Sequence, residues 1–225
     1  MSTWQVGYEE CLKNVDQYIN DVRTLIDRKS YGHAFSLAIL AKEELAKATS
    51  YFIVSSGVID ANDKAGKKLL KLLHSKHELK IGFAYLLLFV PEMISKLKDH
   101  VKKSKLPTRE ERIRDISIDL FDSSIIPLVS KMVDEHKRKW RKIQKLKLKG
   151  FYVDIDKNGT IITPDKFTED EVATQLKELK ENRKIIGELP LWLNQVSPQD
   201  SLTFKEVMKE FVWTPIAKKL ERSKI

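Results

Sequence analysis

Charged side chains interrupt the apolar faces of two predicted helices, and their types suit acid–base chemistry on a phosphate. At about 100° per residue, Glu44 and Lys47 share one face of the first helix with apolar neighbours. His77 and Lys80 share a similar face of the second helix with His74. An unpaired charge in a core costs several kcal/mol, so these groups must pair or line a cleft. We expect the two faces to form one polar site.

Two other interpretations of the same residues remain open. Glu44 and Lys47 could form a purely structural ion pair. His74 and His77 could instead bind a metal together with Glu44, but the sequence offers no obvious third nitrogen or sulfur ligand. We therefore expect neither a metal nor another cofactor.

Basic charge is concentrated between residues 131 and 149, where nine Lys or Arg stand against two acids. Aromatic residues lie within and just after this stretch. Because aromatic rings stack on bases while cations neutralise phosphates, we expect it to bind RNA. The residues predicted to contact RNA are Arg138, Trp140, Arg141, Lys142 and Tyr152.

The basic stretch has two further interpretations. The first is a solvated helix end, where cations favour the helix dipole. The second is a membrane surface, which is less favoured because the apolar stripe beside these lysines looks necessary for the helical bundle. We expect no contact with a membrane.

Composition indicates a folded, mainly helical protein. The 225 residues are 42% hydrophobic and 32% charged, with a formal net charge of +9, so the chain can bury a sizeable core. Only eight glycines and seven prolines occur, which favours long helices over a turn-rich β fold. Cys11 is the single cysteine, which excludes an intrachain disulfide and favours a reducing, cytoplasmic location. The most apolar stretch, residues 81–90, is too short to span a membrane.

Apolar spacing predicts the elements and a three-part organisation. Helices are predicted at residues 4–28, 34–48, 69–90, 108–149, 168–188 and 204–222. Gly150 ends the long basic helix, and Pro190 and Pro198 separate the last two helices. A small β-hairpin is predicted around the turn Asn158-Gly159. The predicted parts are an antiparallel all-α bundle over 1–150, the hairpin over 151–164 and a C-terminal helical extension over 165–225, packed on the bundle.

Three sequence blocks together resemble the AbiV family of abortive-infection proteins, within the HEPN superfamily. They are Ala34-Phe-Ser-Leu-Ala-Ile-Leu-Ala-Lys-Glu-Glu-Leu-Ala-Lys-Ala48, His77-Glu-Leu-Lys80 and Gly150-Phe-Tyr-Val-Asp154. The resemblance covers roughly residues 8–165. It implies a HEPN helical bundle, often dimeric, in a superfamily whose active members cut RNA without metal and act in toxin or antiphage systems.

Carried over residue by residue, the resemblance assigns the first two blocks to a site and the third to its surroundings. Glu44, Lys47, His77 and Lys80 are the implied catalytic residues. Tyr152 and Asp154 match the third block, and we place Asp154 and His74 as structural or supporting residues. The usual Arg-x4-6-His signature of HEPN ribonucleases is absent between residues 131 and 149. Arg28 and His33 have that spacing, but they span a predicted turn, so the motif is not carried over to them.

The sequence thus predicts an AbiV-like antiphage protein that is a toxin-type, metal-independent endoribonuclease. The alternative is a non-catalytic HEPN module that binds a protein or nucleic acid through its basic helix. Expected partners are RNA, a second copy of the chain in a homodimer, and an antitoxin or phage protein.

Overall fold

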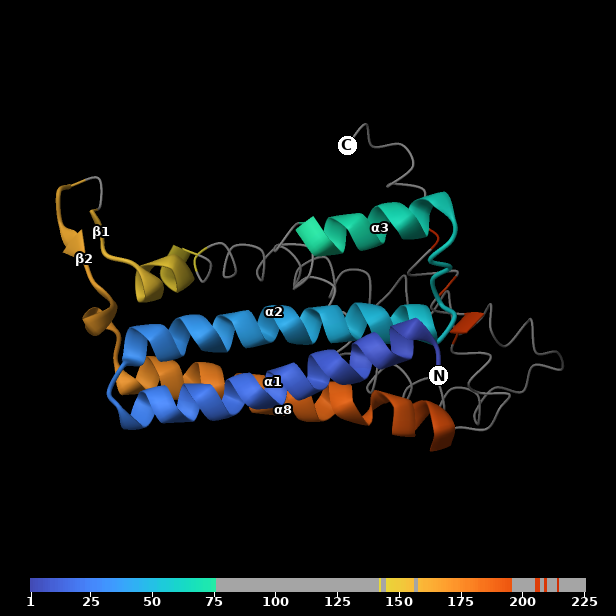
Figure 1. Cartoon of the computed structure of the whole chain (residues 1–225), viewed down its shortest axis with the longest axis horizontal. Helices are drawn as coiled ribbons and strands as arrows, with labels where there is room; N and C mark the ends of the chain where they lie inside the picture. The colour runs from blue at the N-terminus through green and yellow to red at the C-terminus, as the bar shows by residue number, and fades with distance from the viewer. Residues whose placement is uncertain are drawn as a thin grey trace, which may run out of the picture.

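The computed structural model describes residues 1–75, 142, 145–155, 158–195, 205, 206, 209 and 214. These residues are mainly helical, which confirms the all-α class (Figure 1). Most of the predicted helices at 69–90, 108–149 and 204–222 lies outside the described residues. Within the described part of the chain, no helix has the length and apolar character that crossing a membrane requires.

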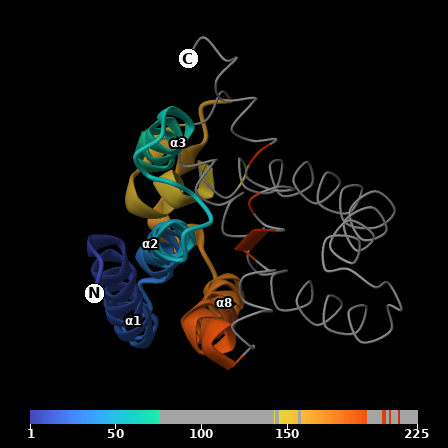
Figure 2. The same cartoon turned by 90° about the vertical axis from the view of Figure 1, so that its right-hand side faces the viewer.

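Helix α2 (Tyr31–Ser55) occupies the centre of the described helices. Helix α1 (Thr3–Asp27) runs antiparallel to it, and α8 (Glu169–Gln195) packs on another side. Figure 2 shows the bundle end-on, with α2 between α1, α8 and the short helix 145–151. Helix α3 (Lys64–Ser75) also contacts α2. The long N-terminal helix and a central second helix are therefore as the sequence predicts.

Burial follows from the spacing of apolar residues. The buried residues of α1 recur every three or four positions, so one stripe of the helix faces the core. They are Tyr8, Cys11, Leu12, Val15, Ile19 and Val22. In α2, 17 of 25 residues are buried, which requires neighbours on nearly every side. Leu179 and Ile186 of α8 complete the core.

Polar side chains fix the starts of two helices. The Ser2 hydroxyl accepts a hydrogen bond from the Gln5 N–H at 3.2 Å, which caps α1. Before α8, the Thr168 hydroxyl accepts from the Glu171 N–H at 3.3 Å, and the Glu171 carboxylate accepts from the Thr168 N–H at 2.9 Å. This reciprocal pair is a capping box, and it sets the direction in which α8 leaves the preceding segment.

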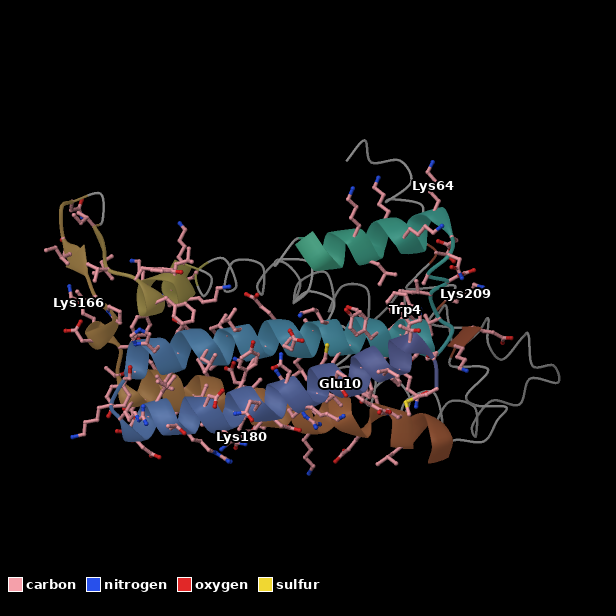
Figure 3. All side chains as sticks on the ribbon, viewed as in Figure 1. Trp4, Glu10, Lys64, Lys166, Lys180 and Lys209 are labelled. Carbon is pink, nitrogen blue, oxygen red and sulfur yellow. The ribbon has the colours of Figure 1, made fainter. Side chains whose placement is uncertain are left out.

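Two short strands lie at the end of the bundle where α2 begins. Strand β1 (Asp154–Ile155) pairs antiparallel with β2 (Ile161–Ile162), and Ile155 lies opposite Ile161. Gly159 has φ +81°, as a turn glycine requires, whereas residues 156 and 157 lie outside the described residues. The 3-10 helix η2 (Pro164–Lys166) follows, and Figure 3 shows the labelled Lys166 at this end of the molecule.

The prediction that Pro190 separates two helices is wrong, because α8 continues through it to Gln195. Proline lacks an N–H, so the carbonyl four residues earlier, that of Ile186, loses its helical donor. The hydroxyl of Tyr8 in α1 donates to this carbonyl oxygen at 2.7 Å. A side chain from α1 therefore replaces the missing backbone hydrogen bond, and α8 stays helical through Pro190.

This replacement predicts a pH-dependent stability. Burial raises the pKa of Tyr8 to about 12, above its ordinary value near 10. The folded protein thus holds the phenolic proton more tightly, so the stabilisation is complete below pH 10 and is lost as pH rises toward 12. We expect Tyr8→Phe to lower the free energy of unfolding by about 1–2 kcal/mol at pH 8, since it leaves a buried carbonyl without a donor. In urea unfolding, the difference between the two proteins should shrink above pH 10. A constant difference would contradict this account.

Candidate active site on the second helix

Three consecutive charged residues of α2, Lys42, Glu43 and Glu44, have three different sets of partners. Successive residues of a helix point about 100° apart, so neighbours in sequence cannot share one face. In a helix that is covered on most sides, each charge must therefore find its own partner. The partners decide which of these residues are available for chemistry.

Lys42 and Glu43 form structural contacts that join other segments to α2. The Lys42 ammonium donates to the Gln175 side-chain oxygen and to the Glu178 carboxylate of α8, each at 2.7 Å. The Lys147 ammonium donates to the Glu43 carboxylate at 2.6 Å, and both side chains are less than a tenth exposed. These contacts attach α8 and the helix 145–151 to different sides of α2.

Glu44 and Lys47 form the remaining pair, and it is more open. Their carboxylate and ammonium are in direct contact one helical turn apart. The side chain of Glu44 is 14% exposed and that of Lys47 is 30% exposed, against 6% for Glu43. The expectation that these two groups pair or line a cleft is met by pairing with each other. Solvent reaches this pair, whereas it scarcely reaches Glu43.

The surroundings of the pair fix the charge of its lysine. Burial lowers the pKa of Lys47, but the hydrogen bond and the charge of Glu44 outweigh this effect, so the pKa is raised overall. The neighbouring Cys11 of α1 is buried, and burial together with the charge and hydrogen bond of Glu44 raises its thiol pKa to about 12. Burial also raises the pKa of Tyr51. These residues, Cys11, Glu44, Lys47 and Tyr51, form one cluster. At neutral pH its lysine is protonated, its thiol is neutral and its phenol is neutral.

This electrostatic state limits what the cluster can do. A lysine that stays protonated can stabilise a developing anion, but it cannot act as a general base. A thiol with a raised pKa is a poor nucleophile, because the thiolate is the reactive form. The described cluster thus supplies a fixed positive charge beside a carboxylate.

The second half of the predicted site is not described. His77 and Lys80 lie outside the described residues, and for His74 only the helical backbone at the end of α3 is described. Convergence of the two halves therefore stays a prediction, and the alternative of a metal held by His74, His77 and Glu44 also involves residues outside the description. Among the described residues, no group of three His, Cys, Asp or Glu side chains is suited to hold a metal ion.

The basic stretch divides into an inner and an outer face. Lys142 and Lys145 are exposed, and so is Tyr152; contact of Lys142 and Tyr152 with RNA stays a prediction. Lys147 faces inward onto Glu43, so counting it with the polyanion-binding residues is wrong. Arg138, Trp140 and Arg141 lie outside the described residues. Asp154 pairs with Ile162 in the two-stranded sheet, and its side chain is not described.

Sequence analysis missed the structural importance of Lys42, Glu43 and Lys147. A usable signal was present: three adjacent charges in a helix that is otherwise apolar on nearly all sides require three separate partners. The predicted site included only the helix face that carries Glu44 and Lys47. The partners of Lys42 and Glu43 lie more than a hundred residues away in sequence, so no local pattern identifies them.

The described helices define a mainly helical protein with a charged centre on its second helix. The model of the AbiV family of HEPN proteins matches residues 4–183. The chain therefore belongs to the AbiV family, and this membership implies an abortive-infection role in antiphage defence. No curated protein and no solved structure matches the chain.

Proposed function

We propose that this AbiV protein is a toxin-type endoribonuclease that needs no metal and uses Glu44, Lys47, His77 and Lys80. The observation that supports the proposal is the state of the Glu44–Lys47 pair. It is partly open to solvent, whereas the adjacent Lys42 and Glu43 are paired with other parts of the bundle. A charged lysine kept accessible in this position suits an anionic ligand such as a phosphate.

The proposed reaction uses the RNA 2′-hydroxyl as the nucleophile. His77 accepts its proton while the 2′-oxygen attacks the adjacent phosphorus, and the bond to the 5′-oxygen breaks. The protonated imidazole then returns the proton to the leaving 5′-oxygen. Lys47 and Lys80 stabilise the negative charge of the phosphorane, and Glu44 orients His77 or keeps a lysine protonated. DNA lacks the 2′-hydroxyl and is not cut.

The exposed face of the basic stretch would hold the flanking strand. On the helix 145–151, Lys145, Lys149 and Tyr152 lie on one face by helical spacing, and Lys142 precedes them on the same side. Lysines neutralise phosphates and the tyrosine ring stacks on a base. Arg138, Trp140 and Arg141 are proposed to extend this surface.

The test compares RNA cleavage by the purified parent protein and by Lys47→Gln. Loss of one group that stabilises the phosphorane is expected to reduce the cleavage rate about 100-fold or more. Lys180→Gln removes an exposed lysine of α8 and lowers the net charge by the same amount. This variant should cleave RNA at the rate of the parent protein. A double variant His77→Ala, Lys80→Ala should be inactive, and a chelator should have no effect. Equal cleavage by Lys47→Gln and the parent would refute the assignment.

The second candidate function is a non-catalytic module that binds nucleic acid or protein through the basic stretch. The observation that favours it is the buried Glu43–Lys147 contact, which holds the exposed lysines of that stretch in place. RNA affinity that falls steeply with salt, without any cleavage product, would favour this function over the first. The homodimer and an antitoxin or phage partner are further proposals, and sedimentation of the purified chain tests the dimer.

A further inference from the structure

Exposed apolar side chains are concentrated in one stretch of the described sequence. Eight large apolar residues are strongly exposed in the described part of the chain, and five of them lie between positions 148 and 161. We call this set the apolar tip. It comprises Leu148, Tyr152, Val153, Ile155 and Ile161, each more than half exposed. Single exposed apolar residues are ordinary, but a cluster of this kind marks a contact surface.

The apolar tip projects from the bundle. Ile155 and Ile161 are cross-strand partners, so their side chains lie on the same face of the two-stranded sheet. Figure 1 shows β1 and β2 beyond the helices, at the end of the molecule where α2 begins. Ile155 and Ile161 thus lie on a narrow projection, and Leu148 lies on the adjoining helix 145–151.

Positive charge lies directly beside the apolar tip. Lys145 and Lys149 share a helix face with Leu148 and Tyr152, while Lys147 faces inward. Lys142 is exposed on the same side. Acidic residues also lie nearby: Asp154 occupies a position of β1 on the opposite face of the sheet from Ile155, and Asp165 and Glu169 follow β2, where Glu169 accepts a hydrogen bond from Tyr31 at 3.1 Å. The basic flank and the apolar tip therefore form one amphipathic surface.

We propose that the apolar tip and its flanking lysines dock on an anionic lipid surface. Aliphatic side chains gain free energy by entering the boundary between headgroups and acyl chains, where a tyrosine ring is also favoured. Lysines bind the negative headgroups. The sequence-based reason against a membrane was that the apolar stripe beside the lysines is needed for the bundle. The five residues of the apolar tip lie outside that stripe and are exposed.

The composition of the surface separates this proposal from two others. Valine and isoleucine cannot stack on bases or neutralise phosphates, so RNA would leave most of the apolar tip in water. A stable protein interface needs roughly 800 Å² on each partner and a well-matched shape, which suits a broad face better than a narrow projection. A lipid surface accepts a small convex insertion. This inference does not depend on RNA cleavage.

The test is co-flotation of the full chain with lipid vesicles. We expect binding to vesicles of phosphatidylglycerol and phosphatidylcholine in equal amounts, and little binding to phosphatidylcholine alone. The double variant Ile155→Ser, Ile161→Ser should bind the anionic vesicles at least about tenfold more weakly. Leu191→Ser, which changes an exposed apolar residue of α8, should bind like the parent.

A second pair of variants tests the basic flank. Lys145→Gln, Lys149→Gln should weaken binding to the anionic vesicles by roughly thirtyfold. Lys177→Gln, Lys180→Gln changes the net charge equally on α8 and should have a much smaller effect. The proposal is overturned if the parent does not float with anionic vesicles, or if the isoleucine variant binds as well as the parent. It is also overturned if that variant instead loses self-association seen in the parent, because a second copy then covers the apolar tip.

Discussion

Replacing Glu43 by alanine is expected to lower the free energy of unfolding by about 3–5 kcal/mol. The change removes the carboxylate that accepts from the Lys147 ammonium at 2.6 Å, and it leaves that ammonium buried. A buried charge without its partner costs far more than an ordinary hydrogen bond contributes. Because Lys147 also holds the helix 145–151 against α2, this segment should be the first to lose protection. Urea unfolding and amide hydrogen exchange measure the two effects.

Two controls isolate the buried pair from a general loss of charge. Glu10→Ala removes one partner of the exposed Glu10–Lys13 pair and should cost no more than about 0.5 kcal/mol. The double variant Glu43→Leu, Lys147→Met removes both buried charges and keeps similar volumes, so it should recover most of the stability lost by Glu43→Ala. If the double variant is as unstable as the single one, packing and not the stranded charge is the cause.

The helical class and the first two helices could be predicted because local patterns determine them. The spacing of Cys11, Val15 and Val22 fixes the inner stripe of α1, and the apolar residues all around the first half of α2 require a central position. These signals depend on neighbours in sequence only. The same kind of reasoning failed at Pro190, since the donor that replaces its missing N–H is Tyr8, which lies 178 positions from the Ile186 carbonyl that it binds.

The candidate site was predictable in part for the same reason. Glu44 and Lys47 are one helical turn apart, so their pairing follows from local geometry. The contact between Glu43 and Lys147 joins residues 104 positions apart, and the sequence gives no rule that pairs them. Helical angles state which residues share a face, but they do not state which element covers it. The different roles of Lys42, Glu43 and Glu44 follow only from the segments that surround α2.

The positions of these neighbours connect the two proposals. Helix α2 carries the open Glu44–Lys47 pair on one flank and, through Glu43, holds the basic segment on another. The apolar tip follows that segment directly in the chain. A single central helix thus fixes both the group proposed to stabilise the phosphorane and the surface proposed to contact lipid. Loss of the Glu43 carboxylate should weaken lipid binding as well as stability, whereas loss of the Lys47 ammonium should affect cleavage and leave lipid binding unchanged.

Gly32→Ala is expected to be the second strongly destabilising change. A β-carbon at Gly32, near the start of α2, would lie 2.7 Å from the α-carbon and 2.8 Å from the carbonyl carbon of Pro164 in η2. Both are backbone atoms, so a rotamer change cannot relieve the clash. The carbonyl oxygen of Gly32 in turn occupies the space that a β-carbon on Gly150 would need. Gly150 therefore serves this close approach, and the helix ends one residue after it, at residue 151. Three segments meet at these two glycines.

Gly187→Ala in α8 is the matched control. Its β-carbon would meet the guanidinium of Arg183, the far end of a flexible side chain that also pairs with Asp16 at 2.8 Å. Alanine in a helix interior gains about 1 kcal/mol over glycine, and a partly exposed ion pair contributes less than that. We expect Gly187→Ala to leave the free energy of unfolding unchanged or slightly higher. Gly32→Ala should lower it by at least about 2 kcal/mol, because η2 has to move away from α2. Similar stabilities of the two variants in urea unfolding would show that the contact between Gly32 and Pro164 is not held in solution.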